Sequence, residues 1–152
     1  MFNLPEKFDE FEEAKREGFL KVKELKEKGA NIVGVFCTYS PYELIYAAGA
    51  YPIALCGKDN ESVQAAQAHL PENLCPLIKS SYGNAISETC PYFYFSDLIL
   101  GETTCDGKKK MYELLGKIKD VHVMHLSQGQ SKKHDFLYWR EEMLEFKRVL
   151  EK

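Results

Sequence analysis

The sequence contains no cysteine pair of the C-x-x-C type and no apolar run long enough to cross a membrane. The first absence excludes zinc fingers and thioredoxin-like redox sites. The second excludes a membrane-spanning helix, which needs about 20 consecutive apolar residues. Basic residues are not in excess either, because the net charge is −3, so composition does not support nucleic-acid binding. We therefore expect neither a nucleic acid nor a membrane among the partners.

Specific nucleotide-binding motifs are absent as well. Neither a Walker-type loop nor G-x-G-x-x-G occurs. The N-terminus is neither basic nor followed by an apolar stretch, so it does not resemble a signal peptide, and we expect a cytoplasmic protein. In that compartment cysteines are metal ligands, catalytic thiols or small buried apolar side chains rather than disulfides. We expect Cys56, in the apolar run 53–56, to be of the buried kind.

What the sequence does contain is the material for one folded domain. It has 152 residues, of which 45% are apolar and 12% aromatic. Helical and strand-like patterns alternate, which favours an α/β fold with parallel strands. We predict a single domain over 1–152, a three-layer αβα Rossmann-like fold with a mostly parallel four-stranded sheet. The expected strands are 31–37, 51–56, 93–100 and 120–126, and the expected helices are 6–28, 40–49, 61–70, one following the loop that begins at 71, one after 105, and one carrying the apolar stripe of 139–150.

Polar segments follow three of these strands, at 37–40, 101–108 and 127–131. Ligand sites in parallel sheets lie at the carboxyl ends of the strands. We therefore expect these three segments to converge on one site.

The segment 101–113 (GETTCDGKKKMYE) places Cys105 between a strand and a helix. We expect Thr103, Thr104 and Asp106 to accept hydrogen bonds from the first helical N–H groups. A helix N-terminus favours an anion such as a thiolate, so Cys105 is predicted to be a ligand or a nucleophile. The lysines at 108–110 oppose the helix dipole and either contact an anionic partner or face solvent.

Cys75 and Cys90 are each followed by proline. Cys-Pro recurs around iron–sulfur ligands, since proline fixes the backbone and removes a competing donor. The spacing is 15 residues from Cys75 to Cys90 and 15 again to Cys105, unlike any compact ferredoxin pattern. On these grounds an iron–sulfur site, gathered across the fold, and unrelated thiols remain equal alternatives.

Other candidate groups have simpler structural interpretations. Glu43 and Glu102 lie near strand ends and are candidate acid–base groups. For Glu43 a role in the first turn of its helix suffices, and Ser40 is the expected cap of that helix. His122 and His125 are three residues apart on a strand, point to opposite faces, and are therefore expected to be structural.

Several stretches resemble the family of 2-hydroxyacyl-CoA dehydratase and benzoyl-CoA reductase subunits (component D), especially its single-chain double-cubane-cluster branch. They are 36–44 (FCTYSPYEL) with 47–50 (AAGA), 70–83 (LPENLCPLIKSSYG), 90–97 (CPYFYFSD), 101–113, and Trp139 with Glu142 and Phe146.

The resemblance implies an iron–sulfur protein of anaerobes in which a cluster, 4Fe–4S or double-cubane, lies between two related α/β domains. An ATP-dependent activator protein would supply low-potential electrons for radical dehydration of an acyl-CoA or for reduction of a small-molecule substrate. The full protein would be a homo- or heterodimer. Among the matching positions Cys75 and Cys105 are the leading ligands, Cys37 and Cys90 are weaker candidates, and Lys79, Ser80 and Ser81 would line the site or support the cluster.

The departure from the family is length, because its members are more than twice as long. The 152 residues match only the N-terminal domain, and a missing C-terminal domain or second subunit would supply at least one further ligand. We expect that the chain alone is inactive and does not complete a stable cluster. Two other functions remain open: a non-catalytic α/β scaffold or metal carrier, and a thiol-based redox protein that uses Cys105.

Overall fold

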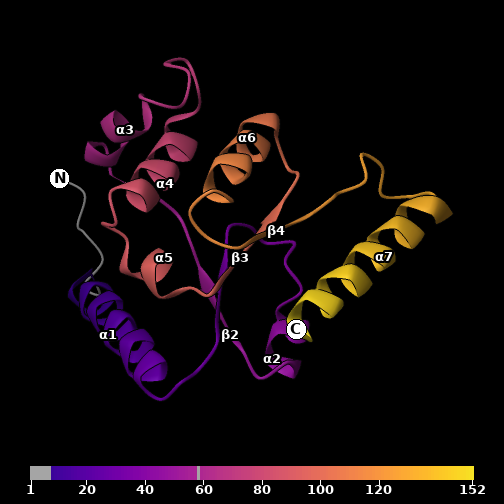
Figure 1. The fold of residues 1–152 in the computed structure, drawn as a ribbon, viewed down its shortest axis with the longest axis horizontal. Helices are drawn as coiled ribbons and strands as arrows, with labels where there is room; N and C mark the ends of the chain where they lie inside the picture. Colours follow the sequence, from indigo (N-terminus) through magenta and orange to yellow (C-terminus); the bar gives the residue numbers. More distant parts are fainter. Residues whose placement is uncertain (1–7, 58) are drawn as a thin grey trace.

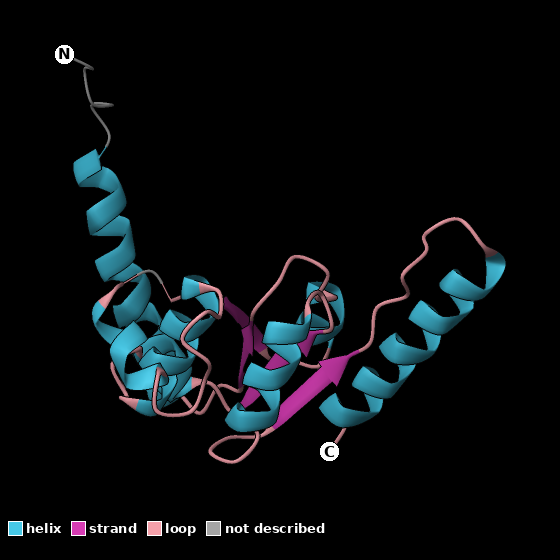
Figure 2. Cartoon of the chain, turned by 90° about the horizontal axis from the view of Figure 1, so that it is seen from above, coloured by secondary structure: helices cyan, strands magenta, loops and turns pink. Residues whose placement is uncertain are grey.

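The structure is a computed structural model that describes residues 8–57 and 59–152, and it shows a parallel sheet between two layers of helices (Figures 1 and 2). This confirms the predicted α/β class and the three layers. The elements, in chain order, are α1 (Phe8–Glu27), β1 (Ile32–Val35), α2 (Tyr42–Ala47), β2 (Tyr51–Ala54), α3 (Glu61–Ala66), α4 (Pro76–Ile86), α5 (Pro91–Phe95), β3 (Leu98–Glu102), α6 (Asp106–Leu115), β4 (Val121–Met124) and α7 (Lys133–Leu150).

The four strands lie in the order β2-β1-β3-β4, and every neighbouring pair is parallel. The two central strands, β1 and β3, consist mostly of apolar residues because helices cover both faces of the sheet. From β1 the chain first moves outward to β2 and then returns across the sheet to β3 and β4. The order therefore reverses between β1 and β3, which is where ligands bind in open α/β sheets.

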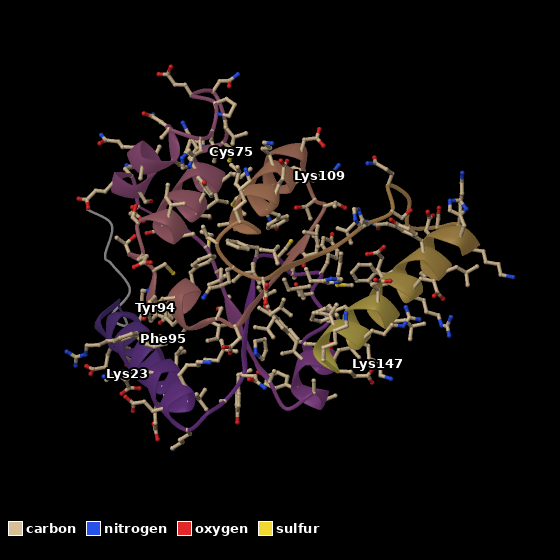
Figure 3. All side chains as sticks on the ribbon, viewed as in Figure 1. Lys23, Cys75, Tyr94, Phe95, Lys109 and Lys147 are labelled. Atoms are coloured by element: carbon tan, nitrogen blue, oxygen red, sulfur yellow. The ribbon has the colours of Figure 1, made fainter. Side chains whose placement is uncertain are left out.

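Two apolar clusters hold the helices against the sheet. One lies under α3, α4, α5 and α6 and includes Ile78, Tyr82, Ile99 and Leu115. The other lies under α2 and α7 and joins Ile45, Leu100 and Phe146. The α1 helix is anchored at its C-terminal half, where the Phe19 and Phe95 rings lie 6.3 Å apart between α1 and α5 (Figure 3).

The predicted strand 93–100 is wrong in its first half, because residues 91–95 form α5 and the strand begins at Leu98. Aromatic residues favour strands, but the three aromatic residues at 93–95, with which the predicted strand begins, are helical here. Pro91 starts the helix, and the Cys90 thiol accepts a hydrogen bond from the Phe93 N–H. At the other end Lys119 Nζ donates to the carbonyls of Phe93, Tyr94 and Ser96.

Two predicted caps are also wrong. Ser40 does not cap α2, because its hydroxyl donates to Glu102 instead. No side chain caps α6, and the Thr103 hydroxyl accepts a hydrogen bond from the Leu126 N–H. Both hydroxyls thus join loops that are distant in sequence.

Within the described residues no helix is long and apolar enough to cross a membrane. The described range begins at residue 8. Residues 6 and 7 of the expected helix 6–28 therefore lie outside it, as do residues 1–7 of the N-terminal segment that was compared with a signal peptide.

The α3 and α4 helices pack unusually closely at Gly83. A Cβ at this position would lie 1.8 Å from the backbone oxygen of Ser62. We expect Gly83→Ala to lower the free energy of unfolding by about 1–3 kcal/mol, because α3 must shift to admit one methyl group. Urea denaturation measures the change. Gly116→Ala is the control, since its new Cβ would meet nothing closer than 3.4 Å and should leave stability nearly unchanged. Equal stability of both variants would contradict the close packing.

Candidate functional site

The three polar segments do converge at the carboxyl edge of the sheet, as predicted. They line a cavity of about 520 Å³ together with the start of α7. Tyr39 comes from the loop after β1, Thr103 and Thr104 follow β3, and the loop 126–130 follows β4. Phe136 and Trp139 of α7 complete the wall. Hydroxyls, amides and aromatic rings from four segments thus surround one space.

Hydrogen bonds join the loops after β3 and β4. The Thr103 N–H donates to the Met124 carbonyl at 3.1 Å, and the Leu126 N–H donates to the Thr103 hydroxyl at 2.9 Å. The Glu142 carboxylate of α7 accepts a hydrogen bond from the His125 N–H at 2.7 Å. The loop after β4 is therefore held from both sides.

Asp135 organises the far wall of the cavity. Its carboxylate accepts hydrogen bonds from the Ser127 hydroxyl and from the Lys132 N–H. These two bonds, the Ser127 bond above all, lower the pKa of Asp135 below its usual value. Gly129 leaves room for this carboxylate, because a Cβ there would lie 2.7 Å from one oxygen of Asp135 and would displace it. The aspartate thereby fixes the loop 127–132 against the first turn of α7.

Glu102 is fully buried at the end of β3, near the point where the strand order reverses. The Ser40 hydroxyl donates to Glu102 Oε1 at 2.5 Å, while Oε2 has no hydrogen-bond partner among the described residues. Tyr112 packs its ring on Gly101, so close that a Cβ there would lie 2.4 Å from the ring. Burial first, and then the Glu102 carboxylate, raise the pKa of the Tyr112 hydroxyl well above its usual range.

Cys75 and Cys105 occupy equivalent positions on neighbouring helices. Cys75 is the N-cap of α4 and Cys105 is the N-cap of α6, and both side chains are exposed. The first turns of these helices touch, because a Cβ on Gly107 would lie 2.7 Å from Ile78 and 3.0 Å from Leu74. Figure 3 shows Cys75 in the space between α4 and α6. Neither thiol takes part in capping its helix, so both are available to a ligand.

Cys37 lies at the same edge. It is half-buried, directly after β1, where Lys108 Nζ donates to the carbonyl of Phe36 at 3.3 Å. After burial and the Glu102 carboxylate, the Cys37 and Cys105 side chains add to the raised pKa of Tyr112. The other two lysines of the 108–110 run form ion pairs on α6 itself, Lys109 with Asp106 and Lys110 with Glu113.

Cys90 and Cys56 share a different environment. Both line a small pocket with Phe36, Ser81 and Phe93. Cys90 is half-buried at the start of α5, whereas Cys56 is exposed. The prediction that Cys56 is a buried apolar side chain is therefore wrong, since the strand that precedes it ends at Ala54, at the edge of the sheet.

The candidate residues 79–81 have partners within the chain. Lys79 Nζ donates to the Glu72 carbonyl at 2.7 Å. The Ser80 hydroxyl lies 3.0 Å from the Ser62 hydroxyl, and the Ser81 hydroxyl accepts from the Gly57 N–H and donates to the Leu77 carbonyl. All three side chains are buried. Lys79 holds the loop before Cys75 against α4, and the two serines hold Gly57 and Ser62 there.

The thiols provide the right donor type for an iron–sulfur cluster but not a complete set. Among residues 8–57 and 59–152, no three Cys, His, Asp or Glu side chains are close enough to hold a metal ion. Of the two histidines expected on one strand, His122 lies on β4 and His125 follows its end. His122 stacks on Phe146 at 5.4 Å, which supports its structural interpretation.

Sequence reasoning missed Asp135 and the bond between Ser40 and Glu102. An acidic residue in the first turn of a helix that follows a polar loop is a known capping signal, and it would have identified Asp135. Ser40 and Glu102 are 62 residues apart, and no local pattern joins them.

Comparison with known proteins identifies the family. The family model described as 2-hydroxyglutaryl-CoA dehydratase, D-component, matches residues 37–152. The chain belongs to this family. The matched range contains Cys37, Cys75, Cys90 and Cys105, whereas α1 and β1 precede it.

Relatives of the D-component family agree with this assignment. The "Putative dehydratase subunit YjiM" of Escherichia coli (strain K12) is 50% identical over 149 residues, which is 98% of this chain but 39% of that protein. The (R)-phenyllactyl-CoA dehydratase beta subunit of Clostridium sporogenes is 27% identical over 66 residues, 43% of this chain and 17% of its own. Lactoyl-CoA dehydratase subunit beta of Anaerotignum propionicum is 32% identical over 53 residues, 35% of this chain and 14% of its own. The chain thus spans well under half the length of these relatives.

The environment of Asp135 gives a prediction about pH. Because the folded protein lowers the pKa of Asp135, its carboxylate stabilises the fold above about pH 4 to 5, and this contribution is lost as the pH falls through the lowered value. Asp135→Asn should therefore lower the urea midpoint at pH 7, and the difference from the wild type should shrink in acid. Glu151→Gln, at an exposed residue at the end of α7, is the control and should change little. A constant difference across the pH range would contradict this account.

Proposed function

We propose that this chain is the part of a 2-hydroxyacyl-CoA dehydratase-like reductase that supplies thiolate ligands to an iron–sulfur cluster. The observation that carries the proposal is the position of Cys75 and Cys105, two exposed thiols at the N-terminal ends of neighbouring helices. Two helix N-termini favour negative charge at this point, and an iron–sulfur cluster held by thiolates is anionic. Cys37, at the same edge, is the next candidate, and Cys90 is further removed in the small pocket with Cys56.

The remaining ligands would come from outside these residues, either from a C-terminal domain or from a second subunit. Two facts support this part of the proposal. The described residues do not gather three metal donors, and the chain spans 39% of the length of the E. coli relative. A bound cluster, 4Fe–4S or double-cubane, would supply one-electron transfer at low potential. The protein residues would hold it: the thiolates bind, Lys79 fixes the loop before Cys75, and Ser80 and Ser81 support α4 through Ser62 and Gly57.

We further propose that the assembled protein receives electrons from an ATP-dependent activator and uses them for radical dehydration of an acyl-CoA, or for reduction of a small molecule. The names of two relatives, a phenyllactyl-CoA and a lactoyl-CoA dehydratase subunit, favour an acyl-CoA substrate and an assembly of several subunits. The cavity beside Tyr39 and Trp139 opens at the same sheet edge as the thiols and is the candidate place for a substrate. Glu102 is buried and is not among the residues that line this cavity, so we infer a structural role for it.

A second candidate is a non-catalytic α/β scaffold or metal carrier. The incomplete donor set favours it, because exposed thiols without a third ligand bind iron weakly and exchange it.

Anaerobic reconstitution with ferrous iron and sulfide tests the proposal. We expect the chain to turn brown, with thiolate-to-iron charge-transfer absorption and an EPR signal after reduction. The colour should be removed by a chelator during desalting, because the ligand set is incomplete. Cys75→Ser and Cys105→Ser should each bind less than half of the wild-type iron. Cys56→Ser is the matched control, an exposed thiol away from the pair, and should bind as the wild type does.

A chain that stays colourless, or a Cys105→Ser variant equal to the wild type, would contradict the cluster-binding role. Iron that binds without sulfide and shows no cluster spectrum would favour the metal-carrier function instead.

A further inference from the structure

The outer side of β4 is an unpaired sheet edge. Among the described residues β4 pairs with β3 alone. The carbonyl of Asp120 accepts from Ile99 N–H at 2.8 Å, and that of Met124 accepts from Thr103 N–H at 3.1 Å. Backbone groups of successive strand residues point to alternate sides, so those of Val121 and Val123 point away from β3. These two valines offer their N–H and C=O groups to a further strand. The next outward N–H, that of His125, donates to the Glu142 carboxylate of α7 at 2.7 Å, so the open part of the edge is limited to the two valines.

The opposite edge of the sheet is protected, which makes the openness of β4 notable. In β2 the N–H of Tyr51 donates to Asn31 at 2.9 Å and that of Leu55 donates to Val35 at 2.7 Å. The alternation therefore places Pro52 at the free edge. Proline has no N–H, and it is one of the residues that keep edge strands from pairing. The outward positions of β4 are both valines, which keep their N–H groups and do not block pairing.

A groove accompanies the open edge. It has a volume of about 400 Å³ and lies between α6 and the valines of β4, with Tyr112 and Gly116 in its lining. Val121 and Val123 are only half-buried, unlike the residues of β1. Figure 2 shows β4 in front of the other strands, with α7 running alongside it. An added strand would hydrogen-bond to the edge and place side chains in the groove.

The connection through α7 does not lead a following strand to this edge. The α6 helix, which joins β3 to β4, covers the face of α3 to α5. The α7 helix covers the other face, where α2 joins β1 to β2. Crossovers between parallel strands are right-handed in almost all proteins. A strand that followed α7 in a longer polypeptide would therefore return toward β2 and would leave the edge of β4 open.

We propose that β4 pairs with β4 of a second copy of this chain, antiparallel, about a two-fold axis beside His122. In this register Val121 of each copy lies opposite Val123 of the other, and each pair exchanges two main-chain hydrogen bonds. The same two residues thus serve on both sides, as a two-fold interface requires. In each copy the side chains of Val121 and Val123 lie on the face of the sheet that α6 covers. In the dimer they would pack against the same two side chains of the other copy.

The interface is small. Pairing over four residues is little beside the roughly 1,200–2,000 Å² of stable interfaces, so the dimer is reversible. It forms at high protein concentration and dissociates on dilution. This proposal is independent of cluster binding.

Sedimentation and amide exchange on the reduced 152-residue chain test the proposal. We expect a monomer–dimer equilibrium, with exchange at Val121 and Val123 measured residue by residue by NMR. Their N–H groups should exchange rapidly in the dilute monomer and at least tenfold more slowly in the dimer. The N–H groups of His122 and Met124, which point to β3, should be equally protected at both concentrations.

Val123→Pro removes a donor that has no partner among the residues that the structure describes, so it should abolish the dimer while the fold persists. Val123→Thr keeps the N–H and the branched shape and should dimerise like the wild type. Three results would overturn the proposal: a wild type that is monomeric at every concentration, protection of Val121 and Val123 that does not depend on concentration, or a dimer whose formation leaves the exchange of both residues unchanged. If Val123→Pro does not fold, the exchange measurement on the wild type still tests the proposal.

Discussion

The contact between the first turns of α4 and α6 is the constraint on which the candidate site depends. Gly107 allows this contact, since any side chain there would press on Leu74 and Ile78. Cys75 and Cys105 immediately precede the two turns. Two thiols and two positive helix ends are thereby brought to one edge of the sheet, close to the point where the strand order reverses. A protein that binds an anionic cluster gains from each of these features.

Long-range polar contacts hold the rest of this edge in place. Ser40 is joined to Glu102, and Thr103 is joined to Leu126. Ser127 is joined to Asp135. Each bond links a loop after one strand to a neighbouring loop or helix, so the segments after β1, β3 and β4 form one connected wall. Such a wall can present thiols and a cavity in fixed positions, and it leaves the completion of the ligand set to a facing domain or subunit.

Local patterns in the sequence predicted the fold class, the parallel sheet and the convergence of the three polar segments, because alternating periodicities determine which strand ends meet. They failed where tertiary contacts override local preference. The aromatic run after Cys90 forms a helix since Pro91 starts it and Lys119 binds its last carbonyls. Ser40 does not cap its helix because its hydroxyl donates to Glu102, 62 residues along the chain. Cys56 is exposed because β2, the strand before it, lies at an edge of the sheet.

The recognition of the family from five sequence stretches is confirmed by the D-component match over residues 37–152. The ligand roles of the cysteines stay predictions, as do the cofactor and the reaction. The central claim is that Cys75 and Cys105 belong to one site, and a short thiol-to-thiol cross-linker followed by peptide mass spectrometry tests it most directly. The account predicts that a link between Cys75 and Cys105 is the main intramolecular product in the folded, reduced chain and disappears in urea. Its absence, or a predominant link from Cys105 to Cys56, would contradict the account.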